Sequence, residues 1–239
     1  MIELKNLHKK FGKLQVLSDL SVNFTMGKAT AVIGHNGSGK TTMIKCILGM
    51  VHPDKGEVIF DGKTVNTEWE YRRKLGYMPQ IGRYPDNMTI GQIVNMIKDI
   101  RKDSLDKLDE ELIQSFDLET MRIKKMGVLS GGTRQKVSAA LAFLFSPDVL
   151  ILDEPTAGLD PVAAEILKDK IQKERNNGKL ILITSHIMNE IEEIADDLVF
   201  IYEGKVAFHR SIEELKLESG SDRIGKALKE MIQKTGGVK

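Results

Sequence analysis

The sequence of 239 residues predicts an α/β fold, and three observations predict it. An apolar run at residues 29–33 leads into a glycine-rich loop and then into a helical pattern of apolar residues. A second apolar run, residues 149–152, ends in two acidic residues, and a third, residues 179–184, follows after a segment of helix length. Buried runs separated by helical segments are typical of a parallel sheet covered by helices.

The composition is ordinary for a globular α/β protein. Charged residues make up 29%, hydrophobic residues 41%, and the net charge is +1, so neither disorder nor a nucleic-acid partner is indicated. The single cysteine, Cys46, lies in an apolar setting that favours a core thiol over a metal or redox role. The N-terminus lacks a secretory signal, and no apolar run approaches the roughly 18 residues of a spanning helix. We therefore expect a cytoplasmic location.

The N-terminal part is expected to contain two strand pairs. Residues 2–25 are typical of short strands with a turn at Phe11-Gly12. Asp61-Gly62 lies between the β-branched runs 57–60 and 63–65, which is a strong hairpin signal. The buried strand at 29–33 lies between these pairs.

The middle of the chain changes to helical spacing. Apolar residues recur from Ile90 to Ile100 and again from Leu105 to Phe116, which predicts two helices. After Pro147 the runs 149–152 and 179–184 indicate parallel strands with a helix between them.

The last part predicts a hairpin followed by a short helix. The hairpin joins residues 199–201 and 205–208, and a capping box starts the helix at Ser211 with Glu214 three positions later.

Residues 34–41, GHNGSGKT, fit the pattern G-x-x-x-x-G-K-[ST] between a strand and a helix. Glycines let backbone N–H groups curl around phosphate oxygens without a Cβ in the way, and the helix N-terminus adds partial positive charge. Lys40 would reach the β- and γ-phosphates, Thr41 would ligate Mg²⁺, and Thr42 would add a hydroxyl to the α-phosphate. A chance match in a glycine-rich turn is the alternative. The predicted phosphate-binding residues are Gly34, Asn36, Gly37, Ser38, Gly39, Lys40, Thr41 and Thr42.

Two acidic residues follow the apolar run 149–152, which places both carboxylates at the C-terminal edge of the sheet, beside the glycine-rich loop. Asp153 suits Mg²⁺ binding through water. Glu154 suits polarising a water molecule for in-line attack on a phosphate. The alternative is a strand end followed by a polar turn, because Pro155 favours a turn in either case.

Leu129-Ser130-Gly131-Gly132 opens a further helix and forms a second glycine-rich helix N-terminus, which suits a second anion site. For this segment alone, a serine-capped helix after a flexible turn is the alternative. Two such sites on one chain suggest a head-to-tail dimer. The segment resembles the signature motif of the ATP-binding-cassette (ABC) ATPase family. In that family the signature of one subunit closes over the γ-phosphate of ATP held by the other, so the resemblance implies that Ser130 and Gly132 act in trans. Gly131 belongs to the same predicted cofactor-binding set.

The resemblance covers nearly the whole chain in family order. Phe11 lies where the family places an aromatic residue against adenine, with a core aromatic as the alternative. Gln80 matches the glutamine-loop residue that senses Mg²⁺ and the nucleotide, and residues 157–160 match the loop that crosses the dimer interface. His186 matches the switch histidine near the γ-phosphate. Thr133 departs from the usual glutamine after the two glycines, which puts the details of subunit closure in doubt.

The resemblance implies a P-loop NTPase (RecA-like) core with an antiparallel β subdomain and an inserted α-helical subdomain. We expect an ABC ATPase domain over residues 1–208, with the helical insert at about 82–147, and a C-terminal helical extension over 209–239. The extension has amphipathic spacing at Ile224, Leu228 and Ile232.

The function implied is that of an ATP-binding, ATP-hydrolysing subunit of an ABC transporter. ATP-driven closure of a dimer with a second ATP-binding subunit, most simply a homodimer, would power a polytopic membrane permease. The chain would then be peripheral on the cytoplasmic face of the inner membrane. In family transporters the surface after the glutamine, here residues 81–88, receives a helix of the membrane subunit.

Two narrower questions stay open. A short insert between Lys40 and Ser130 argues against the chromosome-maintenance ATPases, but a soluble ABC ATPase of a cofactor-assembly complex, such as iron–sulfur cluster biogenesis, is still an alternative. Residues 77–85 and 129–145 are similar to the ATP-binding subunits of the Nos accessory transporters, which support copper-site assembly in nitrous-oxide reductase.

Overall fold

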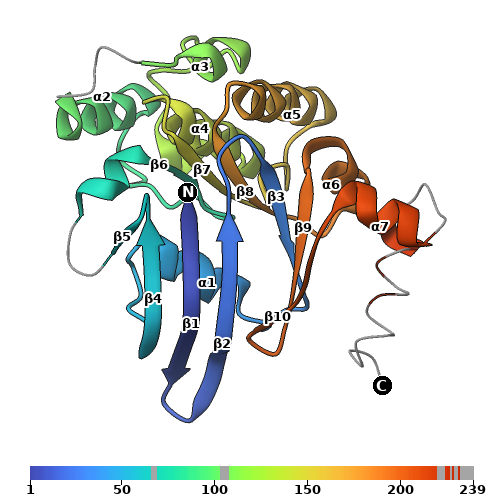
Figure 1. The fold of residues 1–239 in the computed structure, drawn as a ribbon. Helices are drawn as coiled ribbons and strands as arrows, with labels where there is room; N and C mark the ends of the chain where they lie inside the picture. Colours follow the sequence, from blue (N-terminus) through green and yellow to red (C-terminus); the bar gives the residue numbers. More distant parts are fainter. Residues whose placement is uncertain (66–68, 103–107, 220–223, 227, 229–230, 232–239) are drawn as a thin grey trace. The chain divides into compact units, whose positions relative to one another are not determined.

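The structure is a computed structural model, whose helices and strands are labelled in Figure 1. The chain divides into two compact units. The first unit contains residues 1–73 and 180–239, and the second contains residues 74–179. The described residues are 1–65, 69–102, 108–219, 224–226, 228 and 231.

An antiparallel sheet with the strand order β2-β1-β4-β5 lies in the first unit. Asp61 and Gly62 form the turn between β4 and β5 with φ angles of 49° and 78°, both in the left-handed region that a two-residue hairpin turn demands. The predicted hairpin is therefore confirmed. The strands are β1 (Ile2–Phe11), β2 (Leu14–Phe24), β4 (Lys55–Phe60) and β5 (Lys63–Thr64).

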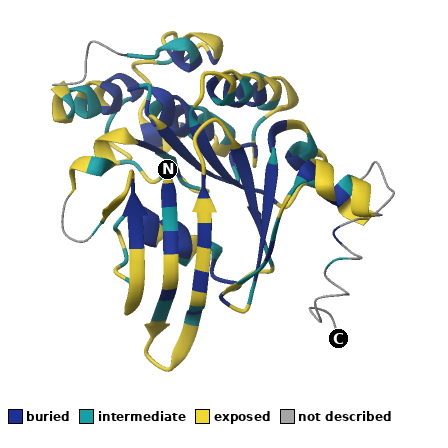
Figure 2. Cartoon of the chain, in the orientation of Figure 1, coloured by how far each residue is buried: buried dark blue, intermediate teal, exposed yellow. Residues whose placement is uncertain are grey.

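The first unit also contains the strands β3 (Ala29–Ile33), β8 (Leu180–Thr184) and β9 (Asp197–Tyr202). Strand β3 pairs in parallel with β8 on one side and β9 on the other. Every residue of β3 and β8 is buried (Figure 2), which explains why these strands are continuous apolar runs in the sequence. The parallel pairing confirms the predicted α/β class.

Strand β10 (Lys205–Ser211) is antiparallel to β9 and completes the predicted hairpin, but it continues past residue 208, where we expected the C-terminal extension to begin. Helix α7 (Ile212–Ser219) follows at once. Its predicted capping box is present, because the Ser211 N–H donates to Glu214 Oε2 at 2.9 Å and the Glu214 N–H donates to Ser211 Oγ at 3.1 Å.

The described part of the C-terminal extension packs within the first unit. Ile224 and Leu228 are buried in an apolar cluster with Phe208 and Leu215. The third residue of the amphipathic pattern, Ile232, lies outside the described residues. Two further helices of this unit are α1 (Lys40–Ile47) and α6 (Met188–Ile194).

The one tryptophan of the chain, Trp69, also lies in the first unit and is half-exposed. The Arg73 guanidinium lies 5.1 Å from the centroid of its ring, a distance typical of a cation–π contact. Tyr71, in the short 3-10 helix η1 (Glu70–Lys74), donates its hydroxyl to the carbonyl of Ile47 at 3.0 Å. This bond ties the segment after the β4–β5 hairpin to the end of α1.

The second unit contains the parallel strands β6 (Leu75–Met78) and β7 (Val149–Asp153) together with helices. Helix α2 confirms the expectation for residues 90–100, and its N-terminus carries a capping box between Thr89 and Gln92. The helices are α2 (Ile90–Ile100), α3 (Glu111–Ser115), η3 (Met126–Val128), α4 (Gly131–Phe143) and α5 (Pro161–Asn176).

The second predicted helix of the insert is shorter than expected. We expected residues 105–116, whereas α3 spans only Glu111–Ser115, and residues 105–107 lie outside the described part of the chain. The Asp109 carboxylate accepts the N–H of Glu111 at 3.1 Å. Asp117, just beyond the helix, has a φ of 53°. A residue in the left-handed region ends a helix, so the local backbone limits α3 despite the apolar periodicity.

An ion-pair cluster joins α3 to α5. The side chain of Lys170 is 3% exposed, and its Nζ lies 2.5 Å from Asp109, 2.7 Å from Glu111 and 2.9 Å from Glu174. Lys179 also pairs with Glu174. Burial lowers the pKa of Lys170, but the hydrogen bonds that its ammonium donates to the three carboxylates outweigh burial and raise the pKa above its ordinary value. This amine is therefore charged over the whole physiological range.

Candidate functional site

The loop between β3 and α1 is built around glycines. Gly37 and Gly39 have φ angles of 81° and 108°, which other residues rarely adopt. A Cβ added to Gly39 would lie 2.9 Å from both the Val16 carbonyl oxygen and the Leu17 side chain. Gly39 is thus required by conformation and by space.

The charged and polar groups of this loop fit an oxyanion. The Lys40 ammonium donates to the carbonyls of Gly34 at 2.6 Å and His35 at 3.1 Å, so it lies over the loop. The Ser38 hydroxyl is buried and has no hydrogen-bond partner among the described residues. An ammonium, an unsatisfied hydroxyl and a helix N-terminus in one glycine-rich loop are the groups that bind phosphate.

The remaining predicted residues of the loop have the exposure that a ligand requires. Thr41 and Asn36 are exposed and Thr42 is partly exposed. Both threonines lie in the first turn of α1, where a hydroxyl is available to a phosphate or to Mg²⁺.

Phe11 and His186 also lie in the first unit. Phe11 ends β1, is 50% exposed, and has the Lys9 ammonium 5.6 Å from its ring centroid. This exposure rules out the alternative of a core aromatic. His186 is exposed and follows the carboxyl end of β8, as its place in the sequence predicts.

The second unit brings Gln80 and Glu154 together. Met78 and Leu152 are opposite each other in the parallel pair β6–β7, and each of the two polar residues lies two positions beyond. The Gln80 carboxamide donates to Glu154 Oε2 at 2.9 Å. The sequence predicted both residues but not this contact, because the register of β6 on β7 cannot be inferred from the motifs.

The backbone of Glu154 is in an unusual conformation, with a φ of 50°. A residue with a Cβ costs energy in this region, and such residues gather at functional sites. Asp153, the last residue of β7, is buried. Burial, and next the Asp153 charge, raise the pKa of Tyr77 in β6. The end of β7 therefore carries the buried carboxylate of Asp153, and the Glu154 carboxylate that follows is held in a fixed direction.

Helix α4 begins at the predicted signature. Ser130 is its N-cap and accepts the N–H of Thr133 at 3.2 Å. The two hydroxyl oxygens of these residues lie 2.9 Å apart, a contact that sequence reasoning missed. A hydroxyl three positions after a serine cap is analogous to the capping box and was the available signal. A Cβ on Gly132 would lie 2.7 Å from the Gly158 carbonyl oxygen, so only glycine fits there.

The second unit also brings the signature close to Gln80. Gln80, Gly131, Gly132, Ala157 and Gly158 line one cavity of about 690 Å³. Candidate residues from three separate segments of the sequence therefore lie around one space.

An ion pair links α4 to the start of α5. The Lys136 ammonium lies 2.7 Å from Asp160, which also accepts the N–H of Ala163 at 2.9 Å as the N-cap of α5. The hydrogen bond from Lys136, followed by the one from Ala163, lowers the pKa of Asp160. One sequence signal indicates this cap, since an aspartate directly before a proline is typical of a helix start.

The two units supply different chemistry. The first offers cationic and hydroxyl donors for phosphate oxygens, and the second offers carboxylates for a hard cation and for a water molecule. Among the described residues no helix is long and apolar enough to span a bilayer.

The comparison with known proteins agrees with this chemistry. A family model for ABC transporters matches residues 17–157. The lantibiotic transport ATP-binding protein SrtF of Streptococcus pyogenes is 33% identical over 225 residues, which cover 88% of this chain and 90% of that protein.

Two solved structures are similar over nearly all of their length. The ATP-binding subunit of an ABC transporter has a TM-score of 0.88 and 27% identity, and the match covers 97% of this chain and 99% of that one. A dimeric ATP-binding cassette in a post-hydrolysis state with ADP and Pi has a TM-score of 0.77 and 25% identity, and covers 89% and 99%. With its glycine-rich loop, strand-end acids and signature helix, the chain belongs to the ABC transporter family, as an ATP-binding subunit.

Proposed function

We propose that this chain hydrolyses Mg·ATP within a head-to-tail homodimer, and that dimer closure and opening drive a membrane partner. Lys40 and the glycine-rich loop bind the phosphates, and Phe11 contacts the adenine. Mg²⁺ would be held by Thr41, Gln80 and Asp153 and would neutralise phosphate charge.

The observation that carries the proposal is the hydrogen bond from Gln80 to Glu154. A carboxylate that a hydrogen bond fixes at a strand end is held in a defined direction, as the polarisation of a water molecule requires. In phosphoryl transfer the protein contributes mainly positioning and electrostatic stabilisation. We assign Glu154 the role of polarising the attacking water, with His186 near the γ-phosphate.

The test is the substitution Glu154→Gln, with Asp148→Asn as its matched control. Both replace a carboxylate by an amide on the same strand segment, but Asp148 is exposed and lies just before β7 at the opposite end. We expect Glu154→Gln to slow hydrolysis about 100-fold or more, the usual effect of removing a positioned base. ATP binding should be retained, and Asp148→Asn should hydrolyse normally. A Glu154→Gln variant with near-normal turnover would overturn the assignment.

The dimer is supported by the second anion site at Ser130 and by the dimeric cassette with ADP and Pi. Each chain has one phosphate loop and one signature helix. If a complete site needs both, supplied by different chains, then two copies arranged head to tail complete both sites. We propose that Ser130, Gly131 and Gly132 of one subunit bind the γ-phosphate held by the other.

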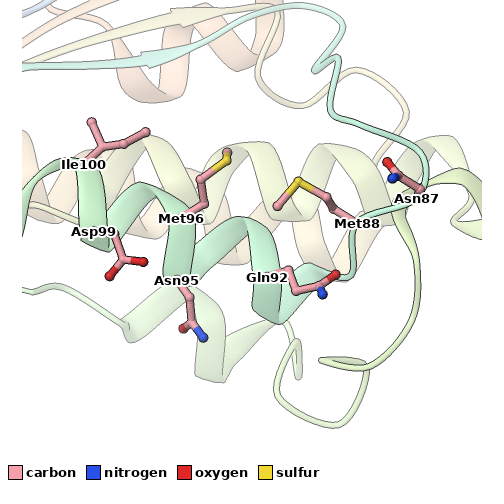
Figure 3. A pocket seen from close by; sticks show the side chains of 7 residues that line it. All are labelled: Asn87, Met88, Gln92, Asn95, Met96, Asp99 and Ile100. Atoms are coloured by element: carbon pink, nitrogen blue, oxygen red, sulfur yellow. The ribbon is translucent and has the colours of Figure 1, made fainter.

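A groove along α2 is our candidate surface for the membrane partner (Figure 3). It has a volume of about 580 Å³ and combines the apolar side chains of Met88, Met96 and Ile100 with the polar side chains of Gln92 and Asp99. Apolar anchors with a polar rim suit a short amphipathic segment of a partner. Through this partner the chain would be peripheral on the cytoplasmic face of the membrane.

The partner is tested by co-purifying the tagged chain from its native membrane and assaying hydrolysis with and without the partner. Ile100→Glu should lose the partner, because Ile100 is 71% exposed on the groove. Leu217→Glu in α7, 79% exposed in the other unit, is the control and should keep the partner. Recovery of soluble assembly proteins alone would instead favour the cofactor-assembly alternative. The relatives reported above give no support to the copper-site role, so it is not part of the proposal.

A further inference from the structure

Thr133 contacts the hydroxyl of Ser130 in two ways. Its backbone N–H donates to Ser130 Oγ at 3.2 Å, and its own hydroxyl oxygen lies 2.9 Å from the same atom. Ser130 is exposed and Thr133 is partly exposed. Because water can reach both side chains, the hydroxyl contact is not needed to satisfy a buried polar group.

Counting donors and acceptors leaves two arrangements of the hydrogens in the Ser130–Thr133 hydroxyl contact. A serine hydroxyl has one hydrogen and two lone pairs. The Thr133 N–H occupies one lone pair of Ser130, and the Thr133 hydroxyl hydrogen, when it donates, occupies the other. Ser130 then has no lone pair left to accept with, and its own hydrogen is available only as a donor to another group.

An anion at the N-terminus of α4 favours this arrangement. A phosphate oxygen without a proton only accepts hydrogen bonds, and the helix terminus carries partial positive charge. In the opposite arrangement, Ser130 donates to Thr133 and offers the anion no hydrogen. The arrangement in which Thr133 donates to Ser130 and Ser130 donates to the anion is therefore the one that loses no hydrogen bond.

We infer that Thr133 is a positioning residue that holds the Ser130 hydroxyl as a donor to the γ-phosphate bound by the other subunit. The inference rests on the proposed function, in which Ser130 acts in trans. Thr133 itself does not touch the nucleotide and acts through Ser130.

The test compares Thr133→Val with Thr133→Ser, both in the Glu154→Gln chain, which should accumulate the ATP-bound dimer. Valine keeps the β-branched shape and lacks the hydroxyl, whereas serine keeps the hydroxyl. The ATP concentration that gives half-maximal dimer is measured by light scattering. We expect Thr133→Val to raise this concentration about fivefold, the effect of one lost neutral hydrogen bond. Thr133→Ser should recover most of the dimer.

Two further measurements separate positioning from folding. Nucleotide affinity at chain concentrations that keep the protein monomeric should be the same in all variants, since the contact acts on the other subunit's nucleotide. In a Ser130→Ala background, Thr133→Val should have no additional effect on the dimer, because coupled residues are not additive. The melting temperature of each variant shows whether the substitution at Thr133 destabilises helix α4.

Three results would overturn the inference. Thr133→Val could dimerise like its parent, or Thr133→Ser could lose as much dimer as Thr133→Val, so that the hydroxyl is not responsible. Alternatively, the loss of dimer could follow a matching fall in melting temperature, which would assign Thr133 to helix stability. If the Glu154→Gln parent forms no ATP-dependent dimer, the proposed function itself fails and the inference falls with it.

Discussion

Glu154 combines a side-chain role with a backbone conformation that its type disfavours. Its φ of 50° places it in the left-handed region, which costs a residue with a Cβ about 1–2 kcal/mol. The hydrogen bond from Gln80 holds the carboxylate in spite of this cost. Such a combination exchanges folding stability for orientation of a reactive group.

This conformation leads to a prediction about two truncations of Glu154. Glu154→Gly and Glu154→Ala both remove the carboxylate, so both should lose hydrolysis. Glu154→Gly should nevertheless be more stable than Glu154→Ala by about 1 kcal/mol, the reverse of the order within a helix. Urea unfolding of the two variants measures the difference. A more stable alanine variant would show that the backbone of Glu154 is not left-handed in solution.

Cys46 gives a second prediction at this scale. It is buried on α1, and burial, the largest influence, raises the pKa of its thiol to about 11. Because the thiolate is the reactive form, Cys46 should react with a disulfide reagent at about pH 8 more than about a hundredfold slower than a free thiol. Denaturant should restore the ordinary rate. Rapid labelling of the native chain would contradict the burial.

Residue types and their order along the chain were sufficient to predict where Lys40, Asp153 and Ser130 lie relative to their strands and helices. Contacts between side chains were not predictable in the same way. The Gln80–Glu154 bond depends on the register of β6 on β7, and the Ser130–Thr133 contact depends on a rotamer. Sequence motifs specify neither the strand register nor the side-chain rotamer.

At the scale of elements, the cluster around Lys170 holds α3 to α5. Replacing Lys170 by Met would leave Glu174, whose side chain is 4% exposed, with Lys179 as its remaining ion-pair partner among the described residues. We expect Lys170→Met to lower the free energy of unfolding by about 3 kcal/mol, the usual effect of breaking a buried ion pair.

The matched control is Lys173→Met, on the same helix and paired with the same Glu111. Its side chain is 57% exposed, so the substitution should cost less than about 1 kcal/mol. Denaturant unfolding checks both values. Equal costs for the two variants would show that the burial of Lys170 has no energetic role.

The same cluster predicts a dependence on pH. Hydrogen bonds from Lys170 and then Lys173 lower the pKa of Glu111. For Glu174, burial raises the pKa, but the hydrogen bonds from Lys179 and Lys170 together outweigh burial, so the pKa is lowered overall. A carboxylate with a depressed pKa stabilises the fold above its unfolded pKa of about 4.3, and this stabilisation is lost as the pH falls toward the folded value. The stability difference between wild type and Lys170→Met should therefore shrink from about pH 7 to pH 3. A constant difference would contradict the prediction.

Elements differed in how well the sequence predicted them. Strand β3 and helix α1 were predicted well because burial and the glycine loop constrain the sequence strongly. Helix α3 was not, because its end depends on the left-handed backbone of Asp117, which the apolar periodicity does not show, and its start lies in the Lys170 cluster, which joins residues far apart in the sequence.

At the scale of the whole molecule, action in trans predicts complementation between inactive chains. Lys40→Ala removes the phosphate contact and Ser130→Arg blocks the signature, so each variant alone should be inactive. A mixed dimer would contain one intact composite site, made of Lys40 from one chain and Ser130 from the other. An equal mixture should recover about a quarter of the wild-type rate, since half of the dimers carry one of two sites.

The readout is steady-state phosphate release as a function of the mixing ratio, with each variant alone as the control. Recovery that peaks near equal amounts supports sites shared between subunits. A mixture that stays inactive at every ratio would indicate that each chain completes its own site.

Trp69 gives this chain a built-in optical reporter. As the only tryptophan, half-exposed and stacked with Arg73 in the first unit, it should emit light whose wavelength follows the unfolding of that unit alone. Far-ultraviolet circular dichroism follows the helices of both units. If ATP binds the loop before α1, its linkage to folding should move the fluorescence midpoint to higher denaturant. Whether the dichroism midpoint moves with it then measures, without any label, how cooperatively the two units fold.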